Sequence, residues 1–325
     1  LIKAKGEFHA AQRLSRLVWG PEGQEMAHLL IAAAHAGGVV LGAFLPSGKL
    51  VGFCQSFPAH KNGRTWLYSH AVAVHPDYRG QGIATALKWQ QRREALKRGF
   101  DLITWTFDPV ESINAHVNLR RLGAVLTGYA EDYYGPMEDK LNAQLPTDRV
   151  FCAWHLQAPG TLQRLAGEYQ PRYTPSPPRL LPGTRQRQSR RSELERRGGA
   201  AAVFVNAVTF VHGRPHPTLL YPPEALDADR IHVCVPTNFQ ELKQADRKLA
   251  VEWRLTMRHI MQSLFQRGYI GTDFDVVAGE TEPIGVYTFK PLPEKTREDE
   301  KADGQTHEQV QPAAPGSGLA KKTGK

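Results

Sequence analysis

A glycine-rich turn at residues 79–84 is the part of this sequence best suited to chemistry. A predicted strand at 69–74 leads through H-P-D-Y at 75–78 into R-G-Q-G-I-A, and an amphipathic helical pattern follows. A turn of this kind between a strand and a helix leaves backbone N–H groups unpaired at the positive end of the helix. Because anions bind at such places, the pattern predicts a site for a ligand that carries phosphate.

The glycine spacing separates this turn from two common phosphate-binding motifs. A P-loop needs G-K-[ST] and a dinucleotide fold needs G-x-G-x-x-G, and neither pattern occurs at the turn. The pattern R-x-x-G-x-A, preceded by V-x-P at residues 74–76, resembles the pyrophosphate-binding motif of the GNAT superfamily of acyl-CoA-dependent N-acyltransferases. The resemblance covers about residues 8–156. It implies a mixed, mostly antiparallel α/β sheet flanked by helices, with acetyl-CoA or another acyl-CoA as cosubstrate.

The resemblance also implies how acyl-CoA is held. Backbone amides of the glycine turn would cradle the CoA pyrophosphate, while Arg79 supports the turn or meets a phosphate. The strand edge at 72–74 would pair with the pantetheine, and the Val72 amide would donate to the thioester oxygen as it becomes an oxyanion. Two asparagines of the next helix could hydrogen-bond CoA or the acceptor, or simply lie on the helix surface. The expected cofactor contacts are Val72, Val74, Arg79, Gly80, Gln81, Gly82, Ile83, Ala84, Asn114 and Asn118.

An amine acceptor must lose its proton before it can attack a thioester. For an amine with a pKa of about 10.4, deprotonation at pH 7 costs roughly 4.6 kcal/mol, so a base or a water chain leading to one is expected. His70 on the motif strand, Asp108 at the end of the next strand and the neighbouring Glu111 are the candidates. For His70 the alternative is a hydrogen-bonded structural histidine.

The resemblance further implies an acid that protonates the departing thiolate. GNAT enzymes often place a tyrosine four residues before the glycine that ends the helix, and counting back from Gly123 gives Leu119. His116, Tyr133 or Tyr134 could take that role, and so could water, because a thiolate with a pKa near 8.5 leaves readily. The expected catalytic groups are Val72, His70, Asp108 and His116.

Two hypotheses follow from these residues. In the first, the protein transfers an acetyl group, or a larger one such as succinyl, from acyl-CoA to the primary amine of a small molecule such as an amino acid. In the second, the missing tyrosine signals lost catalysis, and the protein is a noncatalytic acyl-CoA-binding or regulatory protein.

A third hypothesis concerns the net charge of +9. Residues 161–200 hold nine Arg and three Glu, so most of the excess charge lies in one Pro-rich stretch. That stretch lacks the interleaved aromatic side chains on which single-stranded nucleic acid stacks, which argues against nucleic acid as a partner. A solvated linker fits its composition better.

The composition is that of a soluble protein, since 41% of residues are apolar and 22% are charged. No apolar stretch is long enough to cross a membrane, and the first residues lack the pattern of a signal peptide, so we expect a cytoplasmic location. Cys54, Cys152 and Cys234 lie far apart without a C-x-x-C pair. They are therefore expected to be buried apolar residues, and no metal site is predicted.

Helical and extended patterns alternate along the first half of the chain. Their order, two helices and a hairpin followed by strand, helix, strand, helix and two strands, is typical of a mixed α/β sheet. Helices are predicted at 8–17, 26–33, 81–98 and 112–122, and strands at 39–45, 50–57, 65–74, 102–107, 124–130 and 150–156.

The composition also predicts the domain boundaries. We expect a GNAT-like domain at 1–158, a Pro/Arg-rich linker at 159–199, a smaller C-terminal α/β domain at 200–290 and a disordered tail at 291–325. The C-terminal domain should contain strands at 201–211, 231–235, 269–277 and 284–289, with a long helix at 238–267 that begins at a capping box of Asn238 and Glu241.

The strand, helix and strand of the second domain suggest a degenerate copy of the first. Its turn at 236–239 lacks glycine, so no second CoA is expected there. The second domain could cover the acceptor cleft or form an oligomer contact, and a homo-oligomer stays open.

Overall fold

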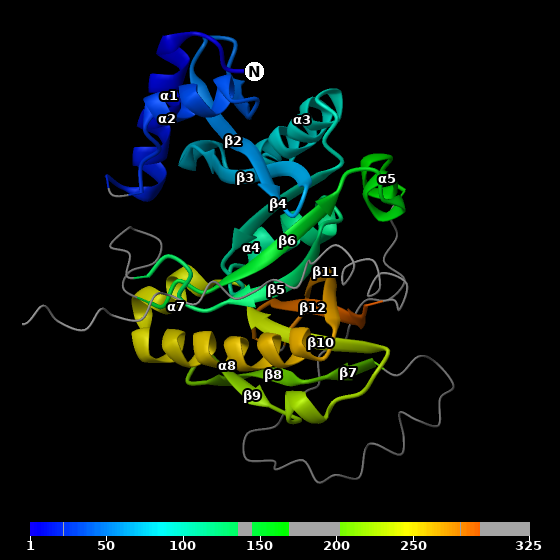
Figure 1. The fold of residues 1–325 in the computed structure, drawn as a ribbon. Helices are drawn as coiled ribbons and strands as arrows, with labels where there is room; N and C mark the ends of the chain where they lie inside the picture. Colours follow the sequence, from blue (N-terminus) through cyan, green and yellow to red (C-terminus); the bar gives the residue numbers. More distant parts are fainter. Residues whose placement is uncertain (22, 136–144, 169–201, 280, 293–325) are drawn as a thin grey trace, which may run out of the picture.

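The computed structural model describes residues 1–21, 23–135, 145–168, 202–279 and 281–292. Within them the chain forms a mixed α/β fold around a sheet of ten strands in the order β1-β2-β3-β4-β6-β5-β11-β12-β10-β7, and β8 and β9 form a separate hairpin. Figure 1 shows the blue N-terminal strands at one end of this sheet and the strands of the C-terminal half at the other. The predicted mixed, mostly antiparallel sheet flanked by helices is confirmed.

The first half of the fold follows the predicted order of elements. The hairpin β1–β2 pairs antiparallel, and β2 continues antiparallel with β3. The elements are α1 (Lys5–Trp19), α2 (Ala27–His35), β1 (Val39–Phe44), β2 (Leu50–Lys61), β3 (Arg64–Val74), α3 (Ile83–Lys97), β4 (Leu102–Phe107), α4 (Ser112–Ala115), the π-helical turn η2 (His116–Arg121), β5 (Val125–Ala130) and β6 (Arg149–His155).

Helices cover both faces of these strands because side chains alternate between the faces of a sheet. Val40 and Phe53 pack in one apolar cluster with α1 and α2, while Leu41 and Cys54 pack in another cluster with Leu87 of α3. The α1 and α2 pair therefore lies on the face opposite to α3.

The C-terminal half repeats the connectivity of the strands that precede it. In each half a first strand leads through helices to an antiparallel hairpin. The second strand of the hairpin lies between the first strand and the other hairpin strand, which gives the orders β4-β6-β5 and β10-β12-β11. The elements are β7 (Ala202–Phe204), β8 (Asn206–Val211), β9 (Arg214–Leu219), β10 (Arg230–Pro236), α7 (Phe239–Ala245), α8 (Arg247–Gln266), β11 (Tyr269–Val277) and β12 (Ile284–Pro291). The two halves therefore share this connectivity, and a degenerate copy stays a prediction.

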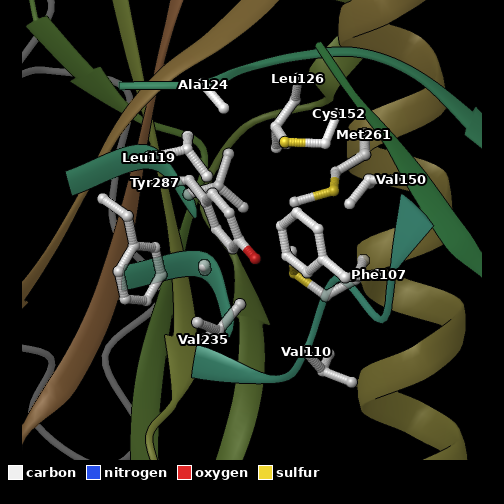
Figure 2. Close-up of a cluster of buried hydrophobic side chains, with 14 of the residues drawn as sticks. Phe107, Val110, Leu119, Ala124, Leu126, Val150, Cys152, Val235, Met261 and Tyr287 are labelled. Atoms are coloured by element: carbon white, nitrogen blue, oxygen red, sulfur yellow. The ribbon is translucent and has the colours of Figure 1, made fainter. Parts of the chain in front are cut away.

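The two halves meet edge to edge. Strand β11 pairs antiparallel with β5 through Gly271 and Leu126, and a Cβ on Gly271 would meet the Leu126 side chain at 2.9 Å. Figure 2 shows the core at this junction, where Tyr287 of the C-terminal half lies beside Phe107 and Leu119 of the first half. One apolar core thus crosses the predicted domain boundary.

Several predicted elements differ from the structure. The predicted helix at 238–267 is two helices, because Asp246 ends α7 and its side chain accepts a hydrogen bond from the Leu249 N–H to cap α8. Asn238 makes no side-chain cap. The predicted strand at 201–211 is interrupted between β7 and β8, and β9 was not predicted because Pro215 and Pro217 obscure its pattern.

The predicted linker and tail fall largely on residues that the structure does not describe. At the start of the linker, Pro159–Leu165 form the helix α5, and the Thr161 hydroxyl donates to the His155 carbonyl at 2.9 Å. The rest of the linker from residue 169 and the tail from residue 293 lie outside the described residues. Among the helices of the described part, none has the length and apolar character needed to span a membrane.

Candidate active site

Strands β3 and β4 separate to leave an open strand edge. They pair in parallel only at Leu67 with Ile103 and at Tyr68 with Thr104. Beyond these pairs, β3 continues to Val74 with β2 as its remaining neighbour in the described sheet. The β3 edge from Ser69 onward therefore presents unpaired backbone groups toward the gap, and an extended ligand can pair with them.

A β-bulge lies where this gap begins. Gln55 pairs with Ala71 and Ser56 pairs with Ser69, so His70 is the extra residue on β3. Bulges bend a strand and redirect a side chain, and they are frequent beside active sites. The alternation along β3 would not reveal this shift, since it depends on the register with β2.

The glycine turn follows the end of β3 directly. Gly80 and Gly82 have φ values of 75° and 77°, which side chains other than glycine rarely tolerate, and a Cβ at either position would meet no atom within 4 Å. Gly82 is the N-cap of α3 and provides no side chain to cap it. The first amides of α3 thus receive no hydrogen bond from a capping side chain, which leaves them available to an anion such as a pyrophosphate.

Arg79 connects the turn to the strand. Its Nε donates to the Val74 carbonyl at 3.4 Å. This contact holds the start of the turn against the end of the open β3 edge. Of the two roles expected for Arg79, support of the turn or contact with a phosphate, it corresponds to the first. Val72, Val74 and the residues from Arg79 to Ala84 therefore form one continuous surface along the gap and the N-terminus of α3.

The His70 side chain pairs with an acidic residue from the α1 and α2 side of the sheet, which is the side opposite to α3. Its Nε2 lies 3.3 Å from Oε1 of Glu25, in the connection between α1 and α2. This hydrogen bond is the main cause that raises the pKa of His70. The His70 side chain is still 39% exposed, so it can reach a ligand as well as Glu25.

The aromatic ring of Phe57 lies beside His70. The Phe57 ring centroid lies 6.1 Å from His70 and 5.4 Å from Tyr68. Farther along the same sheet, Tyr133 packs against Tyr134 at 4.7 Å in the connection that follows β5. An acceptor that approaches His70 beside Phe57 therefore meets an apolar ring.

The comparisons with known proteins identify this arrangement. Residues 8–123 match the sequence model of the acetyltransferase (GNAT) family. The chain contains a GNAT acetyltransferase domain. No curated protein sequence matches the chain.

Solved structures similar to the GNAT domain cover about half of the chain. The ribosomal-protein-S18-alanine N-acetyltransferase from Escherichia coli is 16% identical with a TM-score of 0.39, and the match covers 48% of this chain and 92% of that one. A putative acetyltransferase from Salmonella typhimurium with its cofactor acetyl-CoA is 16% identical with a TM-score of 0.41, covering 49% and 93%. A phosphinothricin acetyltransferase from Sinorhizobium meliloti in complex with AcCoA is 13% identical with a TM-score of 0.39, covering 46% and 84%.

Asp108, at the end of β4 in the GNAT domain, is bound by the C-terminal half. Both of its carboxylate oxygens accept hydrogen bonds from Arg254 of α8 at 2.5 Å. Burial raises the pKa of Asp108, and the charge and hydrogen bonds of Arg254 outweigh burial, so the pKa lies below its usual range. Glu111 accepts from Gln240 of α7, and burial is the main cause that raises its pKa to about 7.

The helical segment of the GNAT domain that would carry the acid is apolar at the expected position. Leu119 is fully buried in the core beside Tyr287. Asn114 is exposed and Asn118 is buried. The segment therefore offers no acid at the position where many GNAT enzymes have a tyrosine.

His116 faces a different opening from His70. It lines a cavity of about 440 Å³ between α4 and η2 of the GNAT domain and Thr237, Asn238 and Val276 of the C-terminal half. Its Nδ1 is buried and finds no hydrogen-bond partner among the described residues. Burial is the main cause that lowers the pKa of His116.

Sequence reasoning missed a buried lysine at the closed end of the gap. Lys88 of α3 is 3% exposed, and its Nζ lies 3.8 Å from the centroid of the Trp105 ring. Burial lowers the pKa of Lys88 to about 8. The signal was present, because Lys88 shares one face of the helix with Gln91 and Ala95, which are both buried.

The cysteines behave as predicted. Cys54, Cys152 and Cys234 are free and buried, and burial raises the pKa of each thiol. A buried thiol that stays protonated is a poor nucleophile.

Proposed function

We propose that this protein is an acyl-CoA-dependent N-acyltransferase that moves an acetyl group, or a larger one such as succinyl, to the primary amine of a small molecule such as an amino acid. The observation that carries the proposal is the continuity of three features, namely the open β3 edge, the glycine turn and the uncapped start of α3. Together they match the shape and charge of a pantetheine arm that ends in a pyrophosphate.

In this proposal the backbone binds the donor. Amides from Gly80 to Ala84 receive the pyrophosphate, Arg79 stays on the Val74 carbonyl, and the pantetheine pairs with the β3 edge. The Val72 amide donates a hydrogen bond to the thioester oxygen. That bond strengthens as the oxygen gains negative charge in the transition state, and one such donor typically changes kcat by a factor of about 100 to 1,000.

His70 is assigned the role of base, and Glu25 holds its ring. The neutral imidazole takes a proton from the acceptor amine as the amine nitrogen attacks the thioester carbon. The new C–N bond forms, the C–S bond breaks, and CoA leaves as a thiolate. The thiolate then takes the proton from the protonated His70, directly or through a water molecule, which returns the site to its starting state.

The remaining expected residues receive other roles. Asp108 joins the two halves through Arg254, so it is assigned a structural role in place of the base. His116 borders the cavity between the halves and could contact an acceptor that extends there. The noncatalytic alternative keeps the same CoA site and omits the proton transfers.

Calorimetric titration with acetyl-CoA, succinyl-CoA and free CoA tests the donor site, and a thiol-release assay over a panel of amines tests transfer. Gly82→Val should abolish binding because the valine strains the turn and crowds the pyrophosphate. Gly63→Val is the matched control, since Gly63 has φ of 75° in a hairpin turn and equally open surroundings.

The outcomes separate the hypotheses. Binding with thiol release that depends on an amine supports the transferase. Binding without turnover on any amine supports the noncatalytic alternative, and a wild-type protein that binds no CoA compound would refute both.

A further inference from the structure

Lys88 is a buried cation whose hydrogen-bond partners are neutral. Its Nζ donates to Ser69 Oγ at 3.0 Å and to Gln91 Oε1 at 2.7 Å, and it lies over the Trp105 ring. No carboxylate of the described residues forms an ion pair with it. The buried Arg254, in contrast, is held by Asp108.

An ammonium group in such a place is costly. Burial disfavours a charge unless an opposite charge compensates it, and an apolar residue would fill the same position on α3 at less cost. The two hydrogen bonds also leave one of the three N–H donors of Lys88 available. The uncompensated charge and the available N–H donor are what an anionic ligand would need in order to bind at Lys88.

The location of Lys88 tells which part of a ligand it would meet. Nζ contacts Ser69 of β3 and Trp105 of β4, and these two residues directly follow the last paired residues of the two strands. Nζ therefore lies at the closed end of the gap. The glycine turn and the pyrophosphate lie at the opposite, open end of the same β3 edge.

In the proposed function the thioester oxygen lies on the Val72 amide, and CoA extends from there toward Val74. The acyl chain must then extend the other way, toward Ser69. Three residues separate Val72 from Ser69, which is roughly 10 Å of strand. Because the Val72 amide donates across the strand and not along it, this length is an upper limit for the acyl group from the thioester oxygen to its far end, and a short dicarboxylic acyl group fits within it.

We propose that Lys88 binds a terminal carboxylate on the acyl group, so that the preferred donors are CoA thioesters of short dicarboxylic acids. This inference rests on the proposed function and deepens it, because it assigns the acyl group by charge and length. Ser69 and Gln91 hold the ammonium in place, and Trp105 forms the wall beside it.

The test compares two acyl groups that have the same four-carbon chain. Succinyl-CoA ends in a carboxylate and butyryl-CoA ends in a methyl group, and acetyl-CoA and free CoA serve as short references. Calorimetry on the wild-type protein should give succinyl-CoA roughly ten- to a hundredfold tighter binding than butyryl-CoA, as expected for a charge-assisted hydrogen bond in a buried site.

Lys88→Met keeps the length of the side chain and removes its charge. It should reverse the preference to butyryl-CoA while leaving the affinity for free CoA unchanged. Lys97→Met is the matched control on the same helix, because Lys97 is exposed and pairs with Glu94. It should keep the preference of the wild-type protein.

Equal binding of succinyl-CoA and butyryl-CoA by the wild-type protein would overturn the inference. So would a Lys88→Met protein that keeps the preference for succinyl-CoA. If the variant does not fold, the comparison of the two thioesters on the wild-type protein still decides. Binding of acetyl-CoA without a preference for the carboxylate would refute this inference alone, whereas failure to bind any CoA compound would refute the proposed function as well.

Discussion

Replacing Lys88 with methionine should stabilise the fold at neutral pH. Burial lowers the pKa of Lys88 from 10.5 to about 8, a difference of about 2.5 units. At 1.36 kcal/mol per unit, the charged form costs the folded state about 3 kcal/mol below pH 8. A residue that destabilises its own protein in this way is expected where function needs the charge.

Methionine removes that cost and forfeits part of the gain from hydrogen bonding. The bonds to Ser69 and Gln91 are worth about 1–2 kcal/mol together, because Gln91 Nε2 still donates to Ser69 Oγ at 3.1 Å after the change. The apolar contacts of the side chain are retained because methionine is similar in length, and a sulfur contact with the Trp105 ring replaces the cation–π contact of the ammonium at a comparable magnitude. We therefore expect a net stabilisation of about 1–2 kcal/mol at pH 7.

The sign reverses with pH. Because the folded-state pKa of Lys88 lies below the unfolded value, the unfolded chain binds more protons between pH 8 and 10.5. The wild-type protein accordingly gains stability over that window relative to the variant. Most of the 3 kcal/mol is regained by pH 10, where the variant should be the less stable of the two.

Urea unfolding at pH 7 and at pH 10 measures both values, with Lys97→Met as the control that should show no such dependence. A difference between wild type and Lys88→Met that is the same at both pH values would refute the reasoning. A loss of several kcal/mol at pH 7 would refute it too, because it would mean that the ammonium contributes net stability.

Two further predictions concern the proposed base and the junction of the halves. Glu25→Gln should shift the acidic limb of the pH profile of kcat/KM to lower pH, because the Glu25 hydrogen bond is the main cause of the raised pKa of His70. If the acidic limb does not move, His70 is not the base. Asp108→Asn should lower the free energy of unfolding in urea by about 3–5 kcal/mol, because it leaves Arg254 buried without its counter-charge. The control Asp101→Asn, at an exposed ion pair with Arg64, should lower it by less than about 1 kcal/mol. Equal losses of stability in the two variants would contradict this account.

The amino-acid sequence by itself determined the glycine turn and several strands, because these features depend on residues that are close together along the chain. The turn at 79–84 was predictable because glycine tolerates φ values near 75° and because a helical pattern follows it at once. The strands at 102–107 and 269–277 were predicted to the residue, since their apolar residues are bounded by clear breakers. The family resemblance rested on the same local pattern.

Only the tertiary structure decided which distant residues meet. The bulge at His70 depends on its register with β2, and Glu25 reaches it from another helix connection. Asp108 is separated from Arg254 by 146 positions, so its interpretation as a base could not be tested against its partner in the sequence. These contacts arise from strand pairing and from packing of α8 against the first half, which one-dimensional periodicity does not encode.

The same distinction applies to Lys88. Lys88 lies on the same side of the predicted helix as Ala95, but nothing in the sequence of α3 tells which residues its ammonium group contacts. Packing of α3 against β3 and β4 buries it at the closed end of the gap, because the residues on the sheet-facing side of a helix are buried whatever their type. The sequence alone therefore predicted where CoA would bind, whereas the fold placed Lys88 at the closed end of the gap, where we propose that it meets the acyl group.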